Sequence, residues 1–177
     1  MRSRSLLILL GGLAIGVGLG MALLLGFDYS TEADNPKPAI GSVSLDFKLP
    51  SILGEEVMLS QFKGSPVLIN FWATWCQPCQ IEMPYIQNRF DQYSPNLVVL
   101  AVNFDEPIST VQKFVKEQYL TFDVLLDTGG RIQELYQIRG YPTTYLVDAE
   151  GIIRVIHIGF MTESQLDEYL MKVGVGG

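Results

Sequence analysis

Cysteine and histidine are scarce in this chain, which has two cysteines and one histidine among 177 residues. Two thiols close only one disulfide, so the chain is not a small domain held together by several disulfides. A structural zinc site needs about four ligands, which these three side chains do not supply. Hydrophobic residues make up 48% of the chain. The sequence therefore predicts a hydrophobic core large enough to be stable without several disulfides or a structural metal.

Basic residues are also few, with twelve Lys and Arg against nineteen Asp and Glu. Two of the twelve, Arg2 and Arg4, precede a long apolar run, so the chain after this run is more acidic still. An acidic domain repels nucleic acid and anionic lipid surfaces. We therefore expect no nucleic-acid partner.

The apolar run from Leu6 to Phe27 contains 22 residues without a charge. A helix of that length rises about 33 Å, which matches the hydrocarbon core of a bilayer. Arg2 and Arg4 favour a cytoplasmic amino terminus, with the rest of the chain outside. A cleaved signal peptide is the alternative, but the run is longer than its usual apolar region. We expect an uncleaved anchor in residues 1–27, a proline-containing linker in residues 28–40 and one folded domain in residues 41–177.

Hydrophobic patterns divide the predicted domain into alternating strands and helices. Continuous apolar runs indicate buried strands, while Ser109 and the Thr162/Gln165 capping box indicate helix starts. This alternation predicts an α/β sheet covered on both faces. The expected strands are 43–49, 56–59, 66–72, 97–102, 122–126, 143–147 and 152–158; the expected helices are 77–93, 109–119, 131–136 and one from Thr162 to about Gly174.

Both cysteines lie in the segment Trp75-Cys76-Gln77-Pro78-Cys79, which follows a buried strand and opens a helix. Unpaired backbone N–H groups at a helix start stabilise a thiolate, and the first cysteine benefits most. We therefore expect Cys76 to be the exposed nucleophile and Cys79 to resolve the mixed disulfide. A metal site is the alternative, but His157 fits an ordinary strand position. We expect neither a metal nor a cofactor.

A thiol peroxidase is another alternative, because the redoxin superfamily shares the upstream pattern Asp46-Phe47-Lys48-Leu49-Pro50. Peroxiredoxins carry a proline seven residues, and a Thr or Ser three residues, before their reactive cysteine. Ile69 and Ala73 occupy those positions here. The residues that activate the peroxide are therefore missing.

Three segments of the chain are characteristic: Asn70-Phe71-Trp72-Ala73-Thr74-Trp75-Cys76-Gln77-Pro78-Cys79, Glu82-Met83-Pro84 and Gly140-Tyr141-Pro142-Thr143-Thr144. With these segments, the chain from Pro38 to its carboxyl end resembles the extracytoplasmic thioredoxin-like proteins of the ResA/TlpA/CcmG type. This resemblance implies a thioredoxin-like fold, with a central mixed β-sheet flanked by helices. It also implies a cis peptide bond before Pro142, whose preceding backbone groups pair with an extended substrate. Trp75, Tyr141 and Pro142 are the expected substrate-binding residues.

Two positions depart from related proteins. Asn70 stands where thioredoxin has a buried Asp, and an amide cannot take a proton. The resemblance suggests Glu82 as the substitute, since residues three apart share a helix face and Glu82 then adjoins Cys79. We expect Glu82 to raise the pKa of the Cys79 thiol and relay its proton. The alternative is an acid favoured by the helix dipole. Gln77 stands where many relatives carry an acid, so the reduction potentials of those relatives do not carry over to this chain.

By resemblance, we expect a reductant of disulfides in exported proteins, with apocytochrome c as an example of a substrate. A membrane-embedded thiol carrier is the expected electron donor. The expected location is a bacterial cell membrane, crossed once, with a monomeric domain outside. A copper chaperone is the non-enzymatic alternative. Copper-delivery relatives on this fold have three residues between their cysteines and a distal histidine, whereas this chain has two residues and only His157.

Overall fold

The computed structural model describes residues 37–176. A five-stranded sheet with strand order β5-β4-β3-β6-β7 forms its centre, and a two-stranded sheet pairs β1 with β2. The central sheet is mixed, because β3 runs parallel to β4 and antiparallel to β6. The elements are β1 (Lys48–Pro50), β2 (Glu56–Met58), the 3-10 helix η1 (Leu59–Phe62), β3 (Val67–Trp72), α2 (Gln77–Tyr93), β4 (Val98–Phe104), α3 (Ile108–Glu117), β5 (Asp123–Asp127), α4 (Arg131–Leu135), β6 (Thr143–Val147), β7 (Ile153–Ile158) and α5 (Glu163–Met171).

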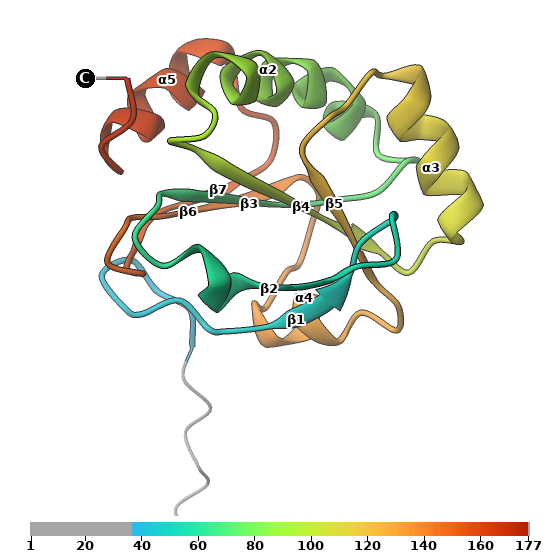
Figure 1. The fold of residues 1–177 in the computed structure, drawn as a ribbon, viewed down its shortest axis with the longest axis horizontal. Coiled ribbons are helices and arrows are strands. Elements are labelled where there is room, and N and C mark those ends of the chain that lie inside the picture. Colours follow the sequence, from blue (N-terminus) through green and yellow to red (C-terminus); the bar gives the residue numbers. More distant parts are fainter. Residues whose placement is uncertain (1–36, 177) are drawn as a thin grey trace, which may run out of the picture. The chain divides into compact units, whose positions relative to one another are not determined.

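Both faces of the central sheet are covered, as the sequence predicts. Helices α2, α3 and α5 lie on one face, and β1, β2 and α4 lie on the other (Figure 1). Strand β3 is buried along its whole length because its side chains alternate between two apolar clusters. Leu68 and Trp72 belong to the cluster under the three helices, whereas Ile69 and Phe71 belong to the cluster on the opposite face. This double burial explains the continuous apolar run.

Helix α2 has the bounds that the sequence predicts, and it continues through Pro84. The capping box of α5 is also confirmed, since Thr162 and Gln165 exchange hydrogen bonds. Two predictions are wrong. Helix α3 begins at Ile108 after Pro107, without a side-chain cap, so Ser109 lies inside the first turn. Of the predicted strand 43–49, only Lys48 and Leu49 belong to β1, which pairs with β2 over three residues, while Val43 makes an isolated bridge to Ile152.

The predicted membrane anchor and nearly all of the predicted linker lie outside the described residues. Among residues 37–176, no helix combines the length and the apolar character needed to cross a bilayer.

Candidate active site

The two cysteines form a disulfide at the start of α2, with their Cα atoms 5.2 Å apart. Cys76 is the residue that caps the helix, and its Sγ accepts a hydrogen bond of 3.2 Å from the backbone N–H of Cys79. Pro78 lies in the first turn, where a missing N–H costs no helical hydrogen bond. The predicted position of both sulfurs at a helix N-terminus is therefore confirmed. Once reduced, Cys76 would keep a donor aimed at its thiolate.

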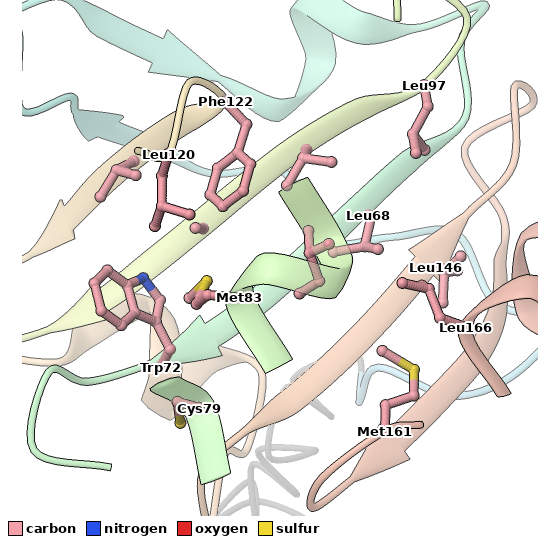
Figure 2. Close-up of a cluster of buried hydrophobic side chains, with 14 of the residues drawn as sticks. Leu68, Trp72, Cys79, Met83, Leu97, Leu120, Phe122, Leu146, Met161 and Leu166 are labelled. Carbon is pink, nitrogen blue, oxygen red and sulfur yellow. The ribbon is translucent and has the colours of Figure 1, made fainter. Parts of the chain in front are cut away.

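The expectation that Cys76 is exposed is wrong for this oxidised state. Cys76 is only 5% exposed and Cys79 1% exposed. Both cysteines belong to the apolar cluster under the helices, together with Trp72 and Met83. Figure 2 shows Cys79 among these buried side chains. Cys76 nevertheless borders an open groove, and a partner disulfide can approach it from that side.

This groove has a volume of about 510 Å³ and brings together two segments far apart in the sequence. Trp75, which is 63% exposed, meets the ring of Tyr141 edge-on with 5.6 Å between ring centroids. Two of the three predicted substrate-binding residues therefore form its aromatic wall. Its lining residues are Trp75, Cys76, Pro78, Ile138, Arg139, Gly140 and Tyr141.

The peptide bond between Tyr141 and Pro142 is cis, as the resemblance implies. Pro142 itself is buried, and its carbonyl oxygen accepts a hydrogen bond of 2.8 Å from the N–H of Gly159. Gly140 and Tyr141 line the groove in its place. A substrate contact in this loop would therefore fall on the residues just before the proline.

Glu82 is a buried carboxyl group, 1% exposed, one helical turn after Cys79. Its Oε1 accepts a hydrogen bond of 3.0 Å from Asn70 Nδ2, and its Oε2 accepts one of 2.7 Å from the backbone N–H of Met161. Burial raises the pKa of Glu82 from 4.5 to about 7, although these hydrogen bonds lower it in part. A carboxyl group in this position can therefore exchange a proton near neutral pH.

Asn70 occupies the centre of the sheet and joins Glu82 to the neighbouring strand β6. Its Nδ2 also donates a hydrogen bond of 2.9 Å to Thr144 Oγ1. Within residues 37–176, the Oδ1 of Asn70 is buried without a hydrogen-bond partner. The amide of Asn70 thus donates one hydrogen bond to Glu82 and one to Thr144, and it cannot itself exchange a proton.

Two contributors to this site have no signal in the sequence. Met161 acts through its main chain, which every residue except proline provides, and Glu106 reaches Thr74 across 32 residues of sequence. Only the folded chain brings these groups to the segment around Cys76.

Residues 37–176 contain no cluster of three His, Cys, Asp or Glu side chains arranged to hold a metal ion. His157 uses both ring nitrogens in short contacts within the domain. Its Nδ1 lies 3.3 Å from Tyr169 Oη, and its Nε2 lies 3.1 Å from the carbonyl oxygen of Phe160. His157 therefore joins β7 to α5 and to the loop between them.

Similar proteins include a thioredoxin-like protein and thiol–disulfide oxidoreductases. A family model described as the AhpC/TSA family matches residues 40–156. The thioredoxin-like protein YneN of Bacillus subtilis is 41% identical over 133 residues, covering 73% of this chain and 78% of that protein. The thiol-disulfide oxidoreductase ResA of Geobacillus kaustophilus is 38% identical over 136 residues, covering 76% of this chain and 78% of that protein.

Among solved structures, a candidate thiol:disulfide interchange protein DsbE from Chlorobium tepidum has a TM-score of 0.73 and 31% identity. The alignment covers 77% of this chain and 99% of that one. This similarity confirms the predicted thioredoxin-like fold with its central mixed sheet. With a family match over more than half of the chain and a disulfide at the start of α2, the chain belongs to the AhpC/TSA family and is a thiol–disulfide oxidoreductase within it.

Proposed function

We propose that this chain is a membrane-anchored reductase of disulfides in exported proteins. The observation that carries the proposal is a buried carboxyl group, Glu82, one helical turn after a redox-active disulfide at a helix N-terminus. The resemblance to ResA-type proteins and the apolar run of residues 6–27 support an extracytoplasmic, membrane-bound location. Because disulfide exchange is reversible, Glu82 can serve the proton of Cys79 in either direction, and the reduction potential decides which direction prevails.

The reaction exchanges one disulfide for another and passes two electrons to the substrate. The Cys76 thiolate attacks one substrate sulfur, a mixed disulfide forms, and the other substrate sulfur leaves as a thiolate. Cys79 then attacks the Sγ of Cys76, which restores the Cys76–Cys79 disulfide and releases the second substrate thiol. The two departing substrate thiolates each take up one proton.

Glu82 is proposed to accept the proton of Cys79 in the second step. The two residues are three apart on α2 and therefore share a helix face. Both side chains are 1% exposed, so water is a poor acceptor at that depth. An ionised Glu82 also raises the pKa of Cys79, which keeps this thiol protonated until a mixed disulfide forms.

Proposed partners follow from the same chemistry. The substrates are exported proteins with a disulfide, apocytochrome c among them. Because each turnover leaves the chain oxidised, a donor must return two electrons, and a membrane-embedded thiol carrier fits an anchored domain. We propose that the domain works as a monomer.

The reduction potential of the Cys76–Cys79 pair tests the direction of electron flow. The purified full-length chain is equilibrated with defined thiol–disulfide buffers, and the fraction of free thiols is measured by alkylation. We expect a value of about −270 mV or lower, in the range of thioredoxin. A value near −120 mV would mark an oxidant and contradict the proposal. Rapid consumption of hydrogen peroxide by the reduced chain would favour a peroxidase.

The role of Glu82 is tested by the pH dependence of disulfide exchange. The rate constant of resolution is measured between pH 5 and 9 for the wild type and for Glu82→Gln. We expect the variant to lose an inflection near pH 7. Glu134→Gln, at an exposed position of α4, is the matched control. Superimposable profiles for wild type and Glu82→Gln would refute the proposed proton transfer.

The proposed location is tested with a membrane-impermeant maleimide on intact cells. After brief reduction, we expect the reagent to label the wild type but not a Cys76→Ala/Cys79→Ala variant. Labelling that requires cell lysis would place the domain in the cytoplasm.

A further inference from the structure

A carboxylate outside the proposed proton path holds the segment that leads into Cys76. Glu106 follows β4, and its Oε2 accepts a hydrogen bond of 2.7 Å from the backbone N–H of Thr74. Its Oε1 accepts a second hydrogen bond from the hydroxyl of Thr74. The Nδ2 of Asn103 donates a third, of 2.7 Å, to Oε2. Glu106 is half-buried, so these three donors replace much of its contact with water.

An uncommon backbone conformation directs Glu106 toward Thr74. Asp105, the residue between β4 and Glu106, has a φ of 46°, in the left-handed region. Non-glycine residues seldom adopt this region and do so mainly where the surroundings enforce it. Here the Oδ1 of Asp105 accepts a hydrogen bond of 2.9 Å from the N–H of Gly129. The chain therefore turns at the end of β4, and the side chain of Glu106 reaches the neighbouring loop.

Thr74 is fixed from its other side as well. Its carbonyl oxygen accepts a hydrogen bond of 2.7 Å from the Nε2 of Gln80 on α2. The N–H, the hydroxyl and the carbonyl of Thr74 thus all have partners within the domain. These hydrogen bonds therefore also fix the position at which the backbone of Trp75, the next residue, begins.

The contacts continue through the aromatic wall of the groove and return to β4. Trp75 meets Tyr141 edge-on, and Tyr141 packs on Phe104 with 5.8 Å between ring centroids. Phe104 is the last residue of β4, two residues before Glu106. The two loops and the end of β4 therefore form a closed ring of contacts beside Cys76.

We propose that Glu106 is a positioning residue that fixes Trp75, through Thr74, in the conformation that receives a polypeptide disulfide. The inference rests on the proposed function and adds the residue that holds the wall of Trp75 and Tyr141 in place for an extended peptide substrate. A small disulfide that touches only the sulfur of Cys76 does not need this wall. Glu106 therefore acts on the recognition of peptide substrates and leaves the intrinsic reactivity of the dithiol unchanged.

The test compares two disulfides with the reduced full-length chain. One is an oxidised peptide carrying Cys-x-x-Cys-His, and the other is dithiobis(nitrobenzoate). Glu106→Gln keeps one oxygen but places an N–H donor against the donors of Thr74 and Asn103. We expect the second-order rate constant with the peptide to fall about tenfold and that with the small disulfide to change less than about twofold. Glu55→Gln, in the exposed turn between β1 and β2, is the matched control and should behave as wild type.

Equal losses with both disulfides, or no loss with the peptide, would overturn the inference. A wild-type chain that reduces the small disulfide but not the peptide would instead refute the proposed function, so the two failures are distinguishable.

A second variant guards against a folding defect in Glu106→Gln. Thr74→Val removes the hydroxyl contact but keeps the shape of the side chain. We expect a fewfold loss with the peptide and no further loss when Thr74→Val is added to Glu106→Gln. Additive losses would show that the two residues act independently and would overturn the inference.

Iodide quenching reports on the tryptophan directly. Trp72 is 0% exposed, so exposed Trp75 dominates the quenching by this anion. We expect Glu106→Gln to change the quenching constant of the oxidised chain, and an unchanged constant would count against the proposed positioning.

Discussion

Two carboxyl groups of the domain are equally buried, 1% exposed each, yet their hydrogen-bond donors come from different places. Asp127, at the end of β5, accepts from the backbone N–H groups of Ile132 and Gln133, five and six residues further on. Glu82 accepts from Asn70 and Met161, which are 12 and 79 residues away. Asp127 therefore closes a local turn onto α4, whereas Glu82 joins α2 to β3 and to the loop before α5. Burial alone does not distinguish a structural carboxylate from one suited to proton transfer.

The largest effect is expected from Asn70→Asp, which places a second carboxylate against Glu82. The variant loses donors to Glu82 and Thr144, and two adjacent buried carboxylates cannot both ionise cheaply. We expect the free energy of unfolding to fall by about 4 kcal/mol at pH 8 and by much less at pH 5. Urea unfolding at both pH values measures it, with Asn88→Asp at an exposed position of α2 as control. Equal losses at the two pH values would contradict like-charge repulsion.

The second largest effect is a change of the free energy of unfolding with pH, caused by the titration of Glu82. Its pKa is about 7 in the folded chain against an ordinary value of 4.5, so the folded chain binds more protons between these values. Stability therefore falls as the pH rises from 4.5, and the loss is complete above about pH 7. The contribution is on the order of 3 kcal/mol, from 1.36 kcal/mol for each pKa unit. Glu82→Gln removes it.

The difference between the stability curves of wild type and Glu82→Gln isolates this group, because all other titrations are common to both. Urea unfolding at several pH values between 4.5 and 8 provides the curves. Parallel curves would mean that Glu82 has an ordinary pKa in the folded chain.

A smaller effect is expected from Asp127→Ala, which leaves the N–H groups of Ile132 and Gln133 without their acceptor. We expect a loss of about 2 kcal/mol, as for a missing cap with buried donors. The pH dependence assigned to Glu82 should be retained, which separates the two carboxylates experimentally. Glu134→Ala, on the exposed side of α4, is the control in the same unfolding assay. If Asp127→Ala also lost the pH dependence of stability, that dependence could not be assigned to Glu82 alone, and the proposed difference between the two carboxyl groups would be wrong.

The smallest effect is expected from Thr162→Ala, which removes the cap of α5 next to the donor Met161. The Oγ1 of Thr162 accepts a hydrogen bond of 3.3 Å from the N–H of Gln165. We expect a loss of about 1 kcal/mol in urea unfolding. Thr162→Ser keeps the hydroxyl and should restore the wild-type value; if it does not, the cap is not the cause.

Local patterns predicted most elements of this fold. The bounds of α2 follow from its first-turn proline and from the strand before it, and β3 follows from an uninterrupted apolar run. The predicted strand 43–49 fails because alternation cannot reveal how many partner residues a strand has. The predicted cap at Ser109 fails because Pro107 already ends the loop, and α3 starts directly after it.

The active site was predictable where the chemistry lies in one segment, and less so where it depends on distant contacts. Cys76 and Cys79 follow from their spacing at a helix start. The resemblance directed attention to Glu82, but its burial and its contact with Met161 depend on the folded chain. Glu106 was not foreseen, because nothing near it in sequence indicates that Asp105 turns the chain toward Thr74.

The hydrogen bond from Met161 to Glu82 has an evolutionary consequence. Its donor is the main chain, so any of nineteen residue types at position 161 supplies the same N–H to the carboxylate. A substitution at position 161 can change the side-chain packing there and still keep the hydrogen bond from its backbone N–H to Glu82. The hydrogen bond from position 161 to Glu82 is thereby independent of the side chain at that position, whereas a substitution of Asn70 removes its hydrogen bond to the carboxylate.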